Sequence, residues 1–158
     1  MVSIILFVIA ILFTVFSLTY KREWHFPENV ETFLSYILLF NMGIMGLLGA
    51  YAHVFMADET ARSIGWAPGS LFQFEIGMAN LAFGVLGVLS YWIRGRFWDA
   101  SIIGWCVLFL GCFIGHVINY YAENNTAPYN IGPYIWFYDL ILPIIILGLF
   151  CSLKFGKR

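Results

Sequence analysis

Four ionisable side chains lie inside strongly apolar stretches of the sequence, each in a different stretch. They are His53, Glu75, His116 and Asp139. A charged group within a bilayer is costly, so it generally faces protein or water, finds a partner and marks a functional site. Two imidazoles and two carboxylates are suitable ligands for a divalent transition metal such as Zn, Fe, Mn or Cu. The sequence therefore predicts a metal site formed by these four residues.

The same four groups allow other interpretations, because no local metal-binding spacing such as HExxH is present. Histidine titrates near neutral pH, so the groups could instead relay protons or handle a small substrate. They could also form purely structural hydrogen bonds. Haem held between His53 and His116 is a less favoured alternative, since there is no haem-attachment motif. Catalytic residues stay unknown: Ser101 is expected far from the histidines, and no glycine-rich phosphate loop is present.

The elements that must position these residues are predicted to be membrane helices. The chain has 158 residues and is 61% hydrophobic but only 11% charged, whereas soluble domains are about 25% charged. Several continuous apolar runs reach the roughly 20 residues that a helix needs to cross the hydrocarbon core. We predict an all-α membrane bundle that forms a single domain over residues 1–158. Its five transmembrane helices are expected at residues 2–20, 30–56, 71–93, 98–121 and 133–153.

The basic residues predict the orientation of these helices. If the helices alternate in direction, seven of the eight Lys and Arg residues fall on one side, and only Arg62 falls on the other. Lys and Arg are enriched on the cytoplasmic side of membrane proteins. We therefore expect the N-terminus outside and the C-terminus in the cytoplasm, in a bacterial inner (plasma) membrane. The seven residues are Lys21, Arg22, Arg94, Arg96, Lys154, Lys157 and Arg158.

This topology places the four ionisable residues at a common depth. Each lies three to six residues from the outer end of its predicted helix. At about 1.5 Å per residue, all four fall within roughly 5–10 Å of the outer boundary. We therefore expect a polar pocket just below the extracytoplasmic face.

Three amide side chains are candidates either to line the pocket or to hold the ionisable groups in place by hydrogen bonds from behind: Gln73, Asn80 and Asn119. Gln73 has an alternative interpretation, because Ser70 three residues earlier is typical of a capping box at a helix start. Glu75 and Asn80 lie about 140° apart around a helix, so they are expected to serve different neighbours.

Backbone features also mark these helices. Small residues recur at three- and four-residue spacing, which allows membrane helices to approach closely. On the third helix, one face carries Gln73, Gly77, Asn80, Gly84 and Gly87, and the fourth contains a GxxxG pair at Gly111 and Gly115. Pro143 lacks an amide hydrogen, so an α-helix would leave the carbonyl of Asp139 without its usual partner.

Three parts of the sequence look familiar together: residues 65–84, Ala52-His53-Val54-Phe55, and Gly115-His116 followed by Asn125, Pro128, Asn130 and Gly132. In these parts the chain resembles an uncharacterised family of small polytopic bacterial membrane proteins. The resemblance covers about residues 41–143. It implies a natural membrane protein and no particular activity.

The leading prediction is thus a membrane protein with a His/carboxylate pocket that binds a metal ion or relays protons. The alternative is an accessory or assembly subunit of a larger membrane complex, with a structural polar cluster. Besides lipid, the partners would be copies of the chain or other subunits. Nucleic acid is excluded as a partner by the net charge of −1. A small transporter is a third possibility, weakened by the lack of an inverted repeat.

Overall fold

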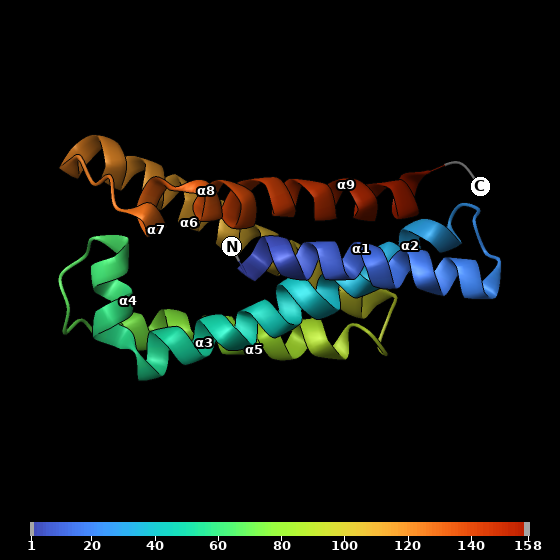
Figure 1. Cartoon of the computed structure of the whole chain (residues 1–158), viewed down its shortest axis with the longest axis horizontal. Coiled ribbons are helices and arrows are strands. Elements are labelled where there is room, and N and C mark those ends of the chain that lie inside the picture. The colour runs from blue at the N-terminus through green and yellow to red at the C-terminus, as the bar shows by residue number, and fades with distance from the viewer. Residues whose placement is uncertain (1, 157–158) are drawn as a thin grey trace.

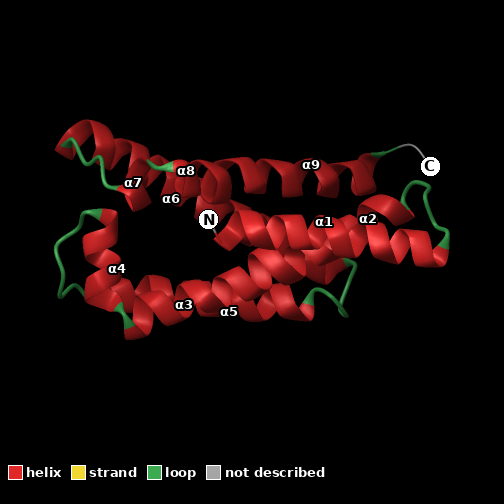
Figure 2. Ribbon diagram, viewed as in Figure 1, coloured by secondary structure: helices red, strands yellow, loops and turns green. Residues whose placement is uncertain are grey.

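The computed structural model describes residues 2–156, and all regular structure within them is helical (Figure 2). Five helical segments are long and apolar enough to cross a membrane. They are Val2–Lys21, Glu28–Phe55, Phe72–Leu89, Arg96–Glu123 and Pro128–Phe155. Their order and positions agree with the prediction, with ends that differ by at most five residues. The predicted all-α membrane bundle with five transmembrane helices is therefore confirmed.

Three of the five segments are single helices. They are α1 (Val2–Lys21), α5 (Phe72–Leu89) and α6 (Arg96–Glu123). The second segment consists of α2 (Glu28–Ile37), a π-helical stretch η1 (Leu38–Ile44) and α3 (Met45–Phe55). The last consists of the short turns α7 (Pro128–Ile131) and α8 (Pro133–Ile135), a π-helical stretch η2 (Trp136–Ile141), and α9 (Leu142–Phe155).

One additional helix, α4 (Ala57–Ile64), lies in the segment that the sequence predicts to be an outer loop. In Figure 1 it runs across one end of the molecule, while the long helices run along it. It ends at Gly65, whose φ of +82° is a left-handed conformation that glycine adopts without strain. The side chain of Asn125 donates a hydrogen bond to the carbonyl of Ile64 at 2.8 Å. This contact ties the end of α4 to the loop that follows α6.

Close contact between glycine faces joins α3 to α5. A Cβ added at Gly84 would lie 2.8 Å from the backbone nitrogen of Leu47, and one added at Gly46 would lie 2.8 Å from the Cα of Gly84. The buried residues of α5 are those of the predicted face: Gln73, Gly77, Asn80, Gly84 and Gly87. The prediction for this helix is therefore confirmed.

The GxxxG pair of α6 behaves differently. Gly111 and Gly115 are exposed, and a Cβ added at either would meet nothing within 4 Å. The close helix approach that this spacing allows is therefore not used at these two glycines within the described chain, and Gly115 instead lines the cavity described below. The helix instead packs through larger side chains, and the rings of Trp105 and Phe109 contact the ring of Tyr138 edge-on at 5.7 and 4.9 Å.

The two π-helical stretches are connected in the core. The hydroxyl of Tyr138 in η2 donates to the backbone carbonyl of Asn41 in η1 at 2.9 Å. The side-chain amide of Asn41 in turn donates to the carbonyl of Ser3 in α1 at 2.8 Å. Because π-helices widen the backbone and recur at functional sites, this region is where the bundle departs from regular packing.

The end of the molecule opposite α4 carries the described basic residues of the predicted cytoplasmic side (Figure 1). Arg94 pairs with Glu31 at 2.6 Å, and Lys154 pairs with Asp99 at 2.7 Å. The predicted basic residues Lys157 and Arg158 lie outside the described part of the chain. The orientation in the membrane stays a prediction.

Candidate functional site

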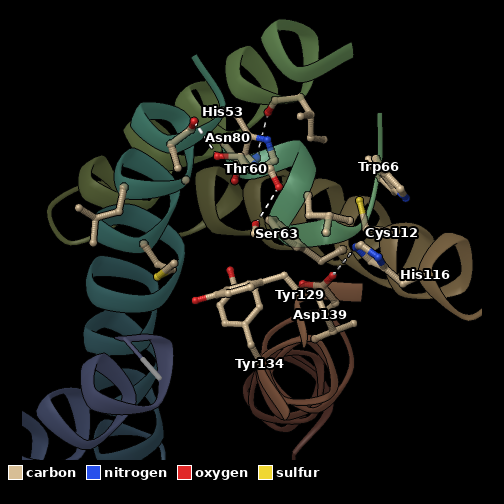
Figure 3. Close-up of a pocket in the computed structure, with 18 of the residues that line it drawn as sticks. His53, Thr60, Ser63, Trp66, Asn80, Cys112, His116, Tyr129, Tyr134 and Asp139 are labelled. Atoms are coloured by element: carbon tan, nitrogen blue, oxygen red, sulfur yellow. Dashed lines mark hydrogen bonds and ion pairs between the residues drawn. The ribbon is translucent and has the colours of Figure 1, made fainter. Parts of the chain in front are cut away.

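A cavity of about 720 Å³ separates two groups of helices at the end of the molecule that carries α4. Residues of α3, α4 and α5 line one part of it, and residues of α6, α7, α8 and η2 line another; Val2 of α1 also contributes. Four of the predicted site residues line this cavity: His53, Asn80, His116 and Asp139. Figure 3 shows the two histidines on different sides of it.

His116 is held in one orientation by Asn130, which lies in α7. The Nδ1 atom of His116 is 2.9 Å from Oδ1 of Asn130. The amide nitrogen of Asn130 donates to the carbonyl of Asn125 at 2.8 Å and to that of His116 at 3.3 Å. Because the amide nitrogen of Asn130 is used by these two carbonyls, its oxygen faces the imidazole ring. Nδ1 of His116 must therefore donate to this oxygen. In the neutral imidazole, Nε2 is then an acceptor.

Asp139 faces this acceptor. Its side chain is 5% exposed, and Oδ2 lies 3.9 Å from Nε2 of His116. That distance is too long for a direct hydrogen bond. Among the described residues, no donor makes a hydrogen bond to the carboxylate. A carboxylate and an imidazole lone pair therefore meet across a short gap at the cavity wall.

Trp66 covers the same imidazole. Its ring stacks on that of His116 at 5.7 Å with an interplanar angle of 12°. The indole nitrogen donates to Oδ1 of Asn119 at 3.0 Å, and that oxygen also accepts from Asn125 at 2.7 Å. Asn119 thus holds Trp66, whose ring in turn stacks on His116. The predicted role of Asn119 in orienting the ionisable groups stays a prediction.

His53 is arranged in a similar way on its own side of the cavity. Its Nδ1 lies 2.7 Å from Oε1 of Gln73. The side chain of Gln73 is thus used as a histidine partner. The hydroxyl of Ser70 does accept a hydrogen bond from the amide of Phe72 at 3.2 Å, so Ser70 caps the start of the helix without Gln73. The capping-box interpretation of Gln73 is therefore wrong. Asn80 lines the cavity too, but its amide donates to the carbonyl of Ile76 in its own helix at 2.9 Å.

Glu75 is not part of this arrangement. It is exposed in the first turn of α5 and does not line the cavity. A carboxylate in this position interacts favourably with the positive end of the helix dipole. Gln73 and Asn80 are buried on the opposite side of α5 from Glu75, as the angular spacing predicts.

The side chains described in residues 2–156 include no group of three or more His, Cys, Asp and Glu that could hold a metal ion. Of the four predicted ligands, only His116 and Asp139 form a close pair. Metal binding by all four therefore stays a prediction from the sequence, without support from the arrangement of the side chains.

The proline in the last segment follows a π-helical turn and not the regular α-helix that the prediction assumed. At the end of η2, the amide of Leu142 donates to the carbonyl of Phe137, five residues earlier. This widened turn carries Asp139, which lines the cavity. The loss of a partner for the backbone carbonyl of Asp139 stays a prediction.

Several site residues are not identifiable from the sequence as functional. Asn130, Trp66 and Tyr134 contact or line the site. In the sequence, however, Trp66 is typical of a residue at the membrane interface, and Asn130 is one of several polar residues in a loop. Asn130 does occur in the part of the sequence that resembles a known family. That occurrence is the one signal that could have pointed to it.

Comparison with known families agrees with the resemblance. The model of a family of unknown function, DUF6790, matches residues 1–155, so the chain belongs to this family. The match extends beyond residues 41–143 and includes the first helix. Among curated proteins and among solved structures, nothing matches the chain.

Proposed function

We propose that this member of the DUF6790 family binds and releases a proton at the His116–Asp139 pair, inside the membrane and next to the cavity. One observation carries the proposal: two acceptors face each other at 3.9 Å in a buried position. Because Asn130 fixes Nδ1 of His116 as the donor, Nε2 has no proton of its own to offer Asp139 in the neutral state.

The energetics of burial favour proton uptake at this pair. An ionised carboxylate that is removed from water without a partner costs several kcal/mol. One additional proton relieves this cost, because it neutralises Asp139 and turns the carboxyl group into a donor that faces the Nε2 acceptor of His116. The site therefore has two states that differ by one proton, as a proton relay requires.

The cavity supplies the polar surroundings that the proton needs. Thr60, Ser63 and Tyr134 line it together with the pair. Ordered water bound to such hydroxyl groups can carry protons between groups that do not touch. We further propose that this end of the molecule faces the extracytoplasmic side, because the opposite end carries most of the Lys and Arg residues.

Infrared difference spectroscopy on acidification tests the proposal. The wild-type protein, in detergent or lipid, should show the C=O stretching band of one protonated carboxyl group that is shielded from solvent. Asp139→Asn should remove this band, whereas Glu75→Gln, which alters an exposed carboxylate outside the cavity, should keep it. A spectrum in which Asp139→Asn has no effect would contradict the proposal.

Metal binding by the predicted residues has its own test. Elemental analysis of protein purified gently and without chelators measures bound Zn, Fe, Mn and Cu, alongside His53→Ala and His116→Ala. A stoichiometric metal that is lost in both variants would support the sequence-based prediction. Protein that is metal-free and binds no added metal would exclude it.

A second candidate function is that of a subunit in a larger membrane complex. The exposed Gly111 favours it, because a Cβ added there would meet nothing within 4 Å in the described part of the chain. Purification in mild detergent should then yield a stoichiometric partner or a self-associated form that Gly111→Leu disrupts. A chain that purifies alone as a monomer would argue against this candidate.

A further inference from the structure

The cavity wall presents more hydrogen-bond acceptors than hydrogen-bond donors to a ligand. The Nδ1–H groups of His53 and His116 are engaged by Gln73 and Asn130, which leaves both Nε2 atoms as acceptors in the neutral rings. The hydroxyls of Thr60 and Ser63 donate to backbone carbonyls of Ala52 and Thr60. The side-chain amide of Asn80 donates within its own helix. Among the lining groups, the donors that these contacts leave available are the tyrosine hydroxyls, the second amide hydrogen of Asn80 and the weakly donating thiol of Cys112.

The charges on the cavity wall have one sign. Asp139 and Glu59 line the cavity, and no Lys or Arg is among its described lining residues. The Asp139 side chain is 5% exposed, and it lacks a hydrogen-bond donor in the described chain. A buried carboxylate of this kind attracts a cation more strongly than an exposed one does, because the surrounding dielectric is low.

Aromatic rings form a large part of the remaining wall. Trp66, Phe72, Phe109, Tyr129 and Tyr134 all line the cavity. Faces of aromatic rings attract organic cations. The volume of about 720 Å³ lies within the range of about 300–1,000 Å³ that is typical of sites for drug-sized ligands.

We propose that the cavity is a binding site for lipophilic organic cations, such as amphipathic amines, with the cationic centre next to Asp139. This inference rests on the proposed function in one respect, since Asp139 receives either the proton or the cation. A neutral ligand that only accepts hydrogen bonds fits less well, because the wall presents mainly acceptors. An anion is excluded by the acidic side chains.

Equilibrium dialysis of the purified full-length protein with tetraphenylphosphonium tests this site. This probe has a permanent charge and carries no proton, and uncharged triphenylphosphine oxide serves as the matched neutral probe. The wild-type protein should bind the cation saturably, beyond its partition into detergent, and at least about tenfold more tightly than the neutral probe. Equal binding of both probes, or no saturable binding of the cation, would overturn the proposal.

Variants locate the site. Asp139→Asn should weaken cation binding by at least about tenfold, which is the direction expected when one partner of a buried charge pair is removed. Glu75→Gln, the matched change outside the cavity, should bind as the wild type does. Because Asp139→Asn could fail to fold, Ala52→Phe provides a second test: it fills the cavity, keeps Asp139 and should abolish binding. Cation binding that is unaffected by Ala52→Phe would place the cation elsewhere and overturn the proposal.

The outcome is separable from that of the proposed function. The infrared measurement uses no added ligand and reports only whether Asp139 takes up a proton. Proton uptake without cation binding would reject the cation site alone. Cation binding that depends on Asp139, without a protonated carboxyl band, would reject the proton function alone.

Discussion

At the residue scale, Asn130 determines which proton chemistry His116 can perform. Its amide is completely buried and makes contacts with His116 and with the loop before α7. A partner of this kind fixes both the tautomer and the orientation of an imidazole. The function of the pair therefore depends on a residue that does not itself titrate.

Replacement of Asn130 by Ala tests this dependence. Asn130→Ala should lower the free energy of unfolding by about 1–3 kcal/mol, because buried hydrogen-bond partners lose their contacts. Thermal unfolding in detergent measures the change, and Thr126→Ala, at an exposed position in the loop before α7, is the control. An Asn130→Ala protein as stable as the wild type would show that these hydrogen bonds do not form.

The ionisable residues themselves are predictable from the sequence, while their partners are not. His53, His116 and Asp139 stand out because charge inside an apolar segment is costly. The distance of each residue from the end of its helix can be counted along the sequence, and this distance predicts that all three lie at the same end of the molecule. The direction of each side chain depends on helix rotation, which is why Glu75 was grouped with them although it is exposed. The partnership of His116 with Asn130 depends on the path of a loop, which no periodicity encodes.

At the element scale, the glycine face between α3 and α5 brings together two of the helices that line the cavity. Helices approach this closely only where side chains are absent. Gly84→Ala should therefore push the two helices apart and lower the stability by about 1–3 kcal/mol, the usual cost of overpacking. Thermal unfolding again provides the measurement.

Gly148→Ala is the matched control for this change. It introduces the same methyl group in α9, where an added Cβ meets nothing within 4 Å. It should leave the stability unchanged or raise it slightly, since alanine favours helix more than glycine does. Equal destabilisation by both substitutions would indicate that helix packing at Gly84 is not the cause.

The long helices follow from apolar length and composition, and their boundaries were predicted closely. Helix α4 was missed because it is short and contains few apolar residues, so it lacks the long continuous apolar run by which the membrane helices were identified. The π-helical stretches were missed as well, because a single wider turn leaves no mark in hydrophobic spacing. Both features position the site: α4 covers the cavity, and η2 carries Asp139.

At the scale of the whole molecule, the distribution of charge predicts how the protein lies in the membrane. In a variant without native cysteines, Glu123→Cys should react with a membrane-impermeant maleimide added to intact cells. Lys21→Cys, at the opposite end, should react only after the cells are opened. The reverse labelling pattern would contradict the proposed orientation and place the cavity on the cytoplasmic side.

The central claim is that one proton moves on and off the His116–Asp139 pair while Nδ1 of His116 stays protonated. Nitrogen NMR of histidine-labelled protein at a series of pH values tests it most directly, with His116→Gln to assign the signal. The account predicts that Nδ1 of His116 carries a proton at every pH, whereas the state of Nε2 changes with pH and responds to Asp139→Asn. A neutral His116 with its proton on Nε2, or a signal that neither acidification nor Asp139→Asn alters, would contradict the account.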